Sequence, residues 1–474
     1  MTDDSVSLST GDGRNRFVYV TAALAALNGL LFGFDTGVIS GAFLYIKDAF
    51  TMSPLAQGIV VSGALAGAAF GAALGGHLAD RWGRRRLILV SAVVFFVGSL
   101  VMAIAPTVEV LVVGRLIDGV AIGFASIVGP LYLSEIAPPE IRGSLVSLNQ
   151  LAVTVGILAS YFVNYAFADA GQWRWMLGTG MVPALILGAG MVFMPESPRW
   201  LVEHGREGQA REVLSRTRTD DQIRAELGEI RETIEQEDGS IRDLLEPWMR
   251  PALVVGVGLA VLQQVTGINT VIYYAPTILE STGFESSASI LATVGIGVVN
   301  VAMTIVAVLL IDRTGRRPLL SVGLVGMTLT LLGLGAAFYL PGLSGIVGWV
   351  ATGSLMLYVA FFAIGLGPVF WLLISEVYPL KVRGTAMGVV TVFNWVANLV
   401  VSLTFPVMVG AITKAGTFWV YAILSAVALA FTYVFVPETK GRSLEAIESD
   451  LRDSMLGRTD ADAPQDVAWG DDDD

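Results

Sequence analysis

Apolar stretches, each long enough to cross a lipid bilayer as a helix, recur from one end of this chain to the other. A helix needs about 20 apolar residues to cross the hydrocarbon core. Because lipid offers no partners to backbone N–H and C=O groups, segments that span it fold as helices. The sequence therefore predicts an all-α membrane protein with twelve transmembrane helices, at 17–46, 55–78, 87–105, 107–136, 142–168, 173–194, 251–280, 288–312, 317–340, 345–377, 384–411 and 416–436.

The composition of the 474 residues agrees with this prediction and excludes several classes of protein. Only 15% of the residues are charged, against about 25% in a typical soluble chain. The net charge of -12 argues against binding to nucleic acid. The chain has no cysteine and only two histidines, and it lacks the glycine-rich loops that bind nucleotides. We therefore expect no metal, no cofactor and no ATP-driven step.

Polar segments divide the chain into five parts. Of the 29 Lys and Arg residues, only Lys47, Arg174 and Lys414 fall in loops on one side of the predicted spans. Cytoplasmic loops are the ones enriched in Lys and Arg, so we place both termini inside the cell. We also expect a monomer in the plasma membrane. The parts are an N-terminal tail (1–16), a six-helix half (17–194), a helical insertion (195–250), a second six-helix half (251–436) and an acidic tail (437–474).

Three motifs occur once in each predicted half, in the same order. "LADRWGRRRL" follows the second span and "LIDRTGRRPL" follows the eighth; "SEIAPPEIRG" follows the fourth and "SEVYPLKVRG" the tenth. "MPESPRW" closes the sixth span and "VPETKGR" closes the twelfth. The matched order indicates a duplicated six-helix unit. Two parallel six-helix repeats are a transporter architecture, in which the substrate site lies near mid-membrane between the halves.

These motifs, with "QQVTGIN", "YYAP" and "GPVFWLLISEVYP", make the chain resemble the sugar porter family of the major facilitator superfamily. The resemblance runs from about Phe17 to Arg442 and is nearest to bacterial xylose–proton symporters and animal glucose facilitators. It implies a transporter that carries a monosaccharide with a proton by alternating access. A passive facilitator is the alternative within transport, and a sugar sensor is the alternative outside it. A membrane-embedded enzyme would need a catalytic constellation, and none is evident.

Amide and tryptophan side chains inside the spans are the expected sugar site. Amides both donate and accept hydrogen bonds, as sugar hydroxyls require, although they can instead join neighbouring helices. Ile157 and Asn394 stand where the xylose symporters have glutamine, which makes the chain look like the glucose facilitators and favours a hexose over a pentose. The resemblance places the sugar contacts at Gln150, Gln263, Gln264, Asn269, Asn300, Trp371 and Asn394.

Two further sets of residues are predicted to open and close the carrier. Tyr273 and Tyr274 precede Pro276 in the outer half of the seventh span, and they form either an outer gate or an interfacial aromatic belt. The resemblance favours the gate. Acids and arginines repeat on the cytoplasmic side; beyond orienting the chain, they are expected to form salt bridges that hold the inner side shut, at Asp80, Arg84, Arg85, Glu135, Arg142, Glu196, Asp312, Arg316, Arg317, Glu376, Arg383 and Glu438.

Asp35 places a carboxylate inside the first predicted span, in "FGFDTGVISG". A charge at the bilayer centre costs about 2.5–3.5 kcal/mol on insertion scales and normally has a partner. Arg115 is the one basic residue well inside a predicted span. The resemblance puts Asp35 at the proton site of the xylose symporters, with Arg115 as its partner. The glucose facilitators carry Asn there, so symport is favoured, although sodium remains an alternative to the proton.

Asp118 departs from the pattern of the symporters, which have a small residue at its place. It follows Arg115 by three residues and shares its helix face. It either competes with Asp35 for Arg115 or merely neutralises the arginine, and we favour the second interpretation.

Overall fold

The computed structural model describes residues 8–138, 142–236, 242–340, 345–379 and 382–440, and every regular element within them is a helix. The helices before the insertion are α1 (Leu8–Ala49), α2 (Pro54–Trp82), α3 (Arg84–Ala103), α4 (Val108–Ile136), α5 (Arg142–Ala166), α6 (Trp173–Gly178) and α7 (Met181–Val192). The insertion contains α8 (Pro198–Glu203), α9 (Glu207–Ser215), α10 (Asp220–Gln236) and the 3-10 turns η2 (Asp243–Leu245) and η3 (Pro247–Met249). The helices after it are α11 (Arg250–Val265), α12 (Ile268–Glu280), α13 (Ser286–Thr314), α14 (Arg316–Tyr339), α15 (Val347–Ile364), α16 (Leu366–Val377) and α17 (Arg383–Phe435).

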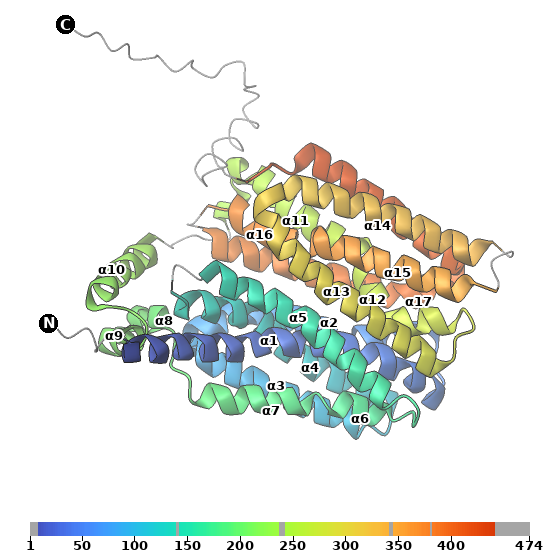
Figure 1. The fold of residues 1–474 in the computed structure, drawn as a ribbon, viewed down its shortest axis with the longest axis horizontal. Coiled ribbons are helices and arrows are strands. Elements are labelled where there is room, and N and C mark those ends of the chain that lie inside the picture. The colour runs from blue at the N-terminus through green and yellow to red at the C-terminus, as the bar shows by residue number, and fades with distance from the viewer. Residues whose placement is uncertain (1–7, 139–141, 237–241, 341–344, 380–381, 441–474) are drawn as a thin grey trace, which may run out of the picture.

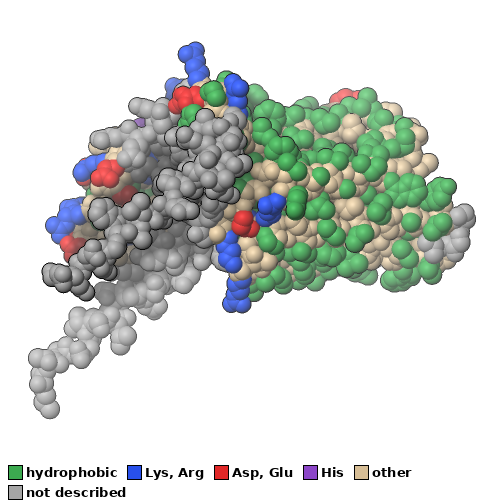
Figure 2. Space-filling model, turned by 90° about the horizontal axis from the view of Figure 1, so that it is seen from above, with side chains coloured by type: hydrophobic (Ala, Val, Ile, Leu, Met, Phe, Trp, Pro, Cys, Tyr) green, Lys and Arg blue, Asp and Glu red, His purple; other side chains and the backbone are tan. Residues whose placement is uncertain are grey.

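These helices form the twelve predicted spans. The pairs α6–α7, α11–α12 and α15–α16 each make one span, and α17 supplies the last two. Ten stretches of the described chain are long and apolar enough to cross a membrane, with α17 counted once and α5 not among them. Hydrophobic side chains cover most of one region of the surface, while most of the visible charged side chains gather beside it (Figure 2). This apolar surface is what a lipid bilayer would cover.

Three predicted spans are interrupted in the structure, which the apolar pattern did not indicate. The span predicted at 251–280 breaks at Gly267, whose φ of 91° is left-handed. A Cβ there would also lie 2.5 Å from the ring of Tyr421, so only glycine fits. The span predicted at 345–377 breaks at Gly365, and the one at 173–194 breaks between α6 and α7. The last two spans run on as α17, with non-helical backbone at Ile412 and Thr413.

Two groups of helices lie one above the other in Figure 1, α1–α7 below and α11–α17 above. Helices α8, α9 and α10 of the insertion gather at one end of the molecule, beside the start of α1 (Figure 1). The groups meet where α2 packs on α17, α5 packs on α13 and α1 packs on α12. In the repeat, the second span corresponds to the eighth and the fifth span corresponds to the eleventh. The contact between the second and eleventh spans is therefore equivalent to the contact between the eighth and fifth spans. The interface therefore has the pseudo-two-fold symmetry that the repeated motifs predict.

Close backbone packing fixes α4 against α2. A Cβ on Gly67 would lie 2.2 Å from the carbonyl oxygen of Leu116, and a Cβ on Gly119 would lie 2.0 Å from that of Ala64. Glycine at both contacts lets the two helices approach to backbone distance. This approach holds the middle of α4, which carries Arg115 and Asp118, firmly inside the first group of helices.

Candidate functional site

A buried ion pair joins α1 to α4 inside the first group of helices. Asp35 is 2% exposed and Arg115 is 1% exposed. Nη1 of Arg115 donates a hydrogen bond to Oδ1 of Asp35, and Nη2 donates to the carbonyl oxygen of Val61 at 3.2 Å. Arg115 is thus the partner that the cost of burying Asp35 requires. The structure brings together the two residues that the sequence predicts for coupling.

Asp118 adds a second carboxyl group to this pair. It is 1% exposed and lies within hydrogen-bonding reach of the Asp35 carboxyl. Its Oδ1 has no hydrogen-bond partner among the described residues. Gly98 of α3 packs against its backbone, since a Cβ there would lie 2.7 Å from the Asp118 nitrogen. The site therefore holds two acids and one base, enclosed on all sides by helices.

Amide side chains form a hydrogen-bonded cluster in the second group of helices, where α11, α12 and α17 meet. Nε2 of Gln264 donates to Oε1 of Gln263 at 3.2 Å and to Oδ1 of Asn394 at 3.1 Å. Nδ2 of Asn394 donates to Oε1 of Gln263 at 2.9 Å. Nδ2 of Asn269, beyond the break at Gly267, donates to Oε1 of Gln264 at 2.6 Å. Because each amide both donates and accepts, these groups can exchange their mutual bonds for bonds to hydroxyls.

The other residues predicted to contact sugar lie outside this hydrogen-bonded cluster. Asn300 is buried on α13, where its carbonyl oxygen accepts from Thr304. Trp371 is half-buried on α16 against Phe370, and Gln150 is half-buried on α5. No hydrogen bond described here joins Gln150, Asn300 or Trp371 to the cluster.

Asn28 is a buried amide that the sequence pattern did not single out. It lies on α1, is 1% exposed, and neither polar atom of its side chain has a partner among the described residues. The indole nitrogen of Trp395 is buried without a described partner in the same way. Asn28 lies within the predicted first span, so the rule applied to the other amides would have found it.

Tyr273 and Tyr274 of α12 are both buried, and they contact both groups of helices. The hydroxyl of Tyr273 accepts from Nδ2 of Asn398 at 3.5 Å and lies within hydrogen-bonding reach of Thr36, beside Asp35. The ring of Tyr274 packs against Phe43 of α1, with ring centroids 5.7 Å apart. These contacts place the predicted gate next to the ion pair.

Lys47 and Glu280 form an ion pair that the sequence analysis missed. It joins the last turn of α1 to the last residue of α12, so it connects the two groups of helices. The hydroxyl of Ser286 donates to the other carboxylate oxygen of Glu280 at 2.9 Å. A signal was present, because Lys47 is one of the few basic residues on its side of the chain. The pair ties together the end of the molecule that lies opposite the insertion.

The contacts described for the repeated acids and arginines lie within each group of helices, and a latch between the halves stays a prediction. In the first group, Nη2 of Arg84 lies 3.0 Å from Glu135, and the backbone nitrogen of Arg85 donates to Glu196 at 2.9 Å. Arg84 also lies 3.4 Å from Asp80. The pairing follows from the fold, because the loop between α2 and α3 lies directly against the ends of α4 and α7.

The second group repeats this arrangement. Nη2 of Arg316 lies 2.7 Å from Glu376, and the backbone nitrogens of Arg316 and Arg317 each donate to Glu438 at 3.0 Å. Burial raises the pKa of Glu438, but these donors outweigh it and hold that pKa below its ordinary value. Arg383 donates to the Tyr378 carbonyl oxygen at 3.1 Å. The side chains of Arg142 and Asp312 lie outside the described residues.

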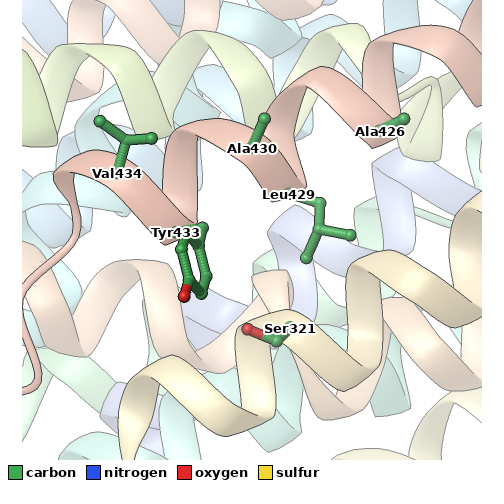
Figure 3. A pocket seen from close by; sticks show the side chains of 6 residues that line it. All are labelled: Ser321, Ala426, Leu429, Ala430, Tyr433 and Val434. Carbon is green, nitrogen blue, oxygen red and sulfur yellow. The ribbon is translucent and has the colours of Figure 1, made fainter.

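An apolar pocket lies between α14 and the last arm of α17, next to Arg317, which contacts Tyr433 of its lining. Figure 3 shows its lining side chains, which are Ser321, Ala426, Leu429, Ala430, Tyr433 and Val434. One hydroxyl from each helix is its only polar feature, which suits lipid or detergent better than a sugar. The described residues contain no group of three or more His, Asp or Glu side chains placed to hold a metal ion.

Residues 21–451 match the family model described as sugar (and other) transporter. The chain is similar to a putative metabolite transport protein of Bacillus subtilis, with 48% identity over 90% of this chain and 94% of the relative. It is similar to the glucose transporter of Staphylococcus epidermidis, with 44% identity over 93% of this chain and 99% of the relative. It is also similar to the galactose-proton symporter of Escherichia coli, with 42% identity over 94% of this chain and 97% of the relative.

The fold is similar to that of a solved transporter. The partially occluded inward-open structure of the xylose transporter from E. coli superimposes with a TM-score of 0.80 at 34% identity. The alignment covers 90% of this chain and all of that one.

Proposed function

This chain belongs to the sugar transporter family of the major facilitator superfamily, and we propose that it carries a monosaccharide across the plasma membrane together with a proton. It is a transporter rather than an enzyme. The observation that carries the proposal is the buried Asp35–Arg115 pair in one half, in a chain whose other half buries neutral amides. A passive sugar carrier has no need of a buried acid and base.

The amide cluster is the proposed centre of the sugar site. Gln263, Gln264, Asn269 and Asn394 present donors and acceptors at one place, and Trp371, Asn300 and Gln150 would complete the site. A hexose is the favoured substrate, because Ile157 and Asn394 replace glutamines of the xylose symporters. The relatives' names support a monosaccharide, since they include glucose and galactose carriers as well as a D-xylose transporter and an arabinose-proton symporter.

Asp35 is the proposed carrier of the coupling proton. In this structure the Arg115 guanidinium donates a hydrogen bond to the Asp35 carboxyl group, a contact that favours its anionic form. When the helices move and this contact opens, the carboxylate loses its partner and takes up a proton. One charge that moves down about 100 mV releases about 2.3 kcal/mol, which supports roughly 40-fold accumulation before any pH gradient is added.

Alternating access would expose the two sites to each side of the membrane in turn. We propose that the insertion and both termini face the cytoplasm, because the Lys- and Arg-rich loops lie at that end. Tyr273, Tyr274 and the Lys47–Glu280 pair then close the outer side. The cytoplasmic charge pairs would brace each half, and their exchange for contacts between the halves would close the inner side in the opposite state. We propose that a monomer performs this cycle.

Uptake into sealed proteoliposomes tests this function. A panel of labelled monosaccharides, with a hexose expected as the best substrate, should accumulate only when a proton gradient is imposed. A passive facilitator would equilibrate the sugar but not concentrate it, with or without the gradient. A sodium gradient replaces the proton gradient in a third arm, and accumulation in that arm alone would contradict proton coupling. No uptake under any condition would favour a sensor.

A further inference from the structure

Asp118 is a buried acid that makes no described hydrogen bond to Arg115. Nη1 of Arg115 donates to Asp35 and Nη2 donates to the Val61 carbonyl oxygen, while its buried Nε has no partner among the described residues. Asp118 instead lies within hydrogen-bonding reach of the Asp35 carboxyl, while its Oδ1 has no partner among the described residues. A carboxyl–carboxyl hydrogen bond needs a proton, because two ionised carboxylates offer only acceptors.

The charges around Asp118 lead to the same conclusion. The charged groups that face it are Asp35 from α1 and Arg115 from its own helix. α3 presents the backbone at Gly98, and Tyr273 of α12 is the further titratable neighbour of Asp35. With both acids ionised, the site would hold two negative charges and one positive charge, on side chains that are all at most 2% exposed. One shared proton makes the group neutral.

The proton can be assigned to one of the two acids. Asp35 accepts a hydrogen bond from the guanidinium, and a carboxylate beside a guanidinium is stable as the anion. Asp118 has one bare oxygen, which would be costly on a buried anion but is tolerable on a neutral acid. An acid kept neutral by its surroundings so that it can donate a hydrogen bond is a known catalytic device.

We propose that Asp118 stays protonated throughout transport and donates its proton in a hydrogen bond to the Asp35 carboxylate. It is then a positioning residue, which stabilises ionised Asp35 and so sets the pH at which Asp35 accepts the transported proton. Asp118 keeps its own proton, and the transported proton binds to Asp35 as Arg115 separates. This inference rests on the coupling role proposed for Asp35.

Two substitutions distinguish a neutral Asp118 from an ionised one. Asparagine imitates the neutral acid, because its amide still donates to Asp35, whereas alanine donates nothing. Initial rates of proton-driven sugar uptake are measured against pH, each normalised to its own maximum. We expect Asp118→Asn to keep the wild-type profile. We expect Asp118→Ala to move the half-maximal pH upward by roughly one unit, because ionised Asp35 loses a donor.

Two results would overturn the proposal. A downward shift in Asp118→Asn would mean that the substitution removed a negative charge, so Asp118 would be ionised. An unchanged profile in Asp118→Ala would mean that Asp118 does not act on Asp35.

Infrared spectroscopy tests the protonation without relying on transport. Wild-type protein at pH 8 should show the carbonyl stretching band of a protonated carboxylic acid, and Asp118→Asn should lack it. Absence of the band in wild-type protein would contradict the proposal even if the variants fail to fold. If wild-type proteoliposomes show no proton-driven uptake, the proposed function fails, while the infrared result still decides the state of Asp118.

Discussion

The two halves of the molecule share a frame but bury different chemistry. In both, an arginine after a left-handed glycine pairs with an acid near the end of a later helix: Arg84 with Glu135, and Arg316 with Glu376. Glu196 and Glu438 accept backbone N–H groups at equivalent places. We call these charge pairs, with Glu196 and Glu438, the frame, and each arginine–glutamate pair a brace. The frame lies at one end of each half, where it joins the ends of several helices.

The halves differ in the membrane interior. The first half buries three ionisable residues, Asp35, Arg115 and Asp118, whereas the second buries neutral amides such as Gln263 and Asn394. Buried charge is costly unless it is paired, so it persists where the charge itself is used. Amides carry no charge but can bond many hydroxyls. This difference is the basis of our proposal that one half binds the proton and the other binds most of the sugar.

The largest expected effect concerns the frame, and it tests how alike the two braces are. In the first half, the side chains of Arg84 and Glu135 are 4% and 5% exposed; in the second half, those of Arg316 and Glu376 are 10% and 20% exposed. Removing one partner of a buried ion pair leaves the other charge buried without a compensating charge. Arg84→Ala should therefore lower the free energy of unfolding by about 3–5 kcal/mol. Arg316→Ala should lower it by less, about 1–3 kcal/mol, because water reaches Glu376.

Denaturant unfolding of the purified variants in detergent measures both values. Equal losses would show that the difference in burial has no energetic consequence, and that the two braces are equivalent.

The next effect concerns the sugar site in the second half. Gln263→Ala removes an amide that bonds Gln264, Asn394 and the Leu366 carbonyl oxygen. We expect sugar affinity to fall by roughly 5- to 150-fold. The hydroxyls of the bound sugar would lose a hydrogen-bond partner, and a buried polar group without a partner costs about 1–3 kcal/mol. Calorimetry on the purified protein measures the affinity, and Gln209→Ala, on the exposed face of α9, is the matched control. Equal affinity in both variants would remove Gln263 from the site.

The smallest effect concerns the tie between the halves at the outer end. Lys47→Ala removes the ion pair with Glu280, which is partly exposed and contributes at most about 1 kcal/mol. We expect the outer side to open more often. A cysteine introduced at buried Ser402 should then react up to about fivefold faster with an impermeant reagent added outside. Equal rates with and without Lys47→Ala, in protein that is otherwise unchanged, would show that the pair does not hold the gate.

The sequence predicts the spans well, because a bilayer imposes length and apolarity on each of them. It also predicts the Asp35–Arg115 contact, since a buried acid needs a base and only one stood inside a predicted span. The breaks at Gly267 and Gly365 could not be predicted. A glycine in an apolar helix looks the same whether it serves close packing or a change of backbone direction.

The pairing of the repeated acids and arginines was also beyond the sequence. Glu135 has several arginines within reach in any plausible arrangement, and only the packing of α3 on α4 selects Arg84. The amide cluster lies between these cases: its members were predicted individually, but their mutual bonds depend on the break between α11 and α12.

We propose that the half with the buried charges couples transport to the proton through Asp35. Asp35→Asn keeps the size of the side chain and removes its titration. In proteoliposomes with an imposed proton gradient, we expect this variant to lose all uphill sugar accumulation while it still exchanges sugar for sugar. Asp48→Asn, an exposed acid at the end of the same helix, should accumulate sugar as the wild type does. Uphill accumulation that persists in Asp35→Asn would contradict the claim.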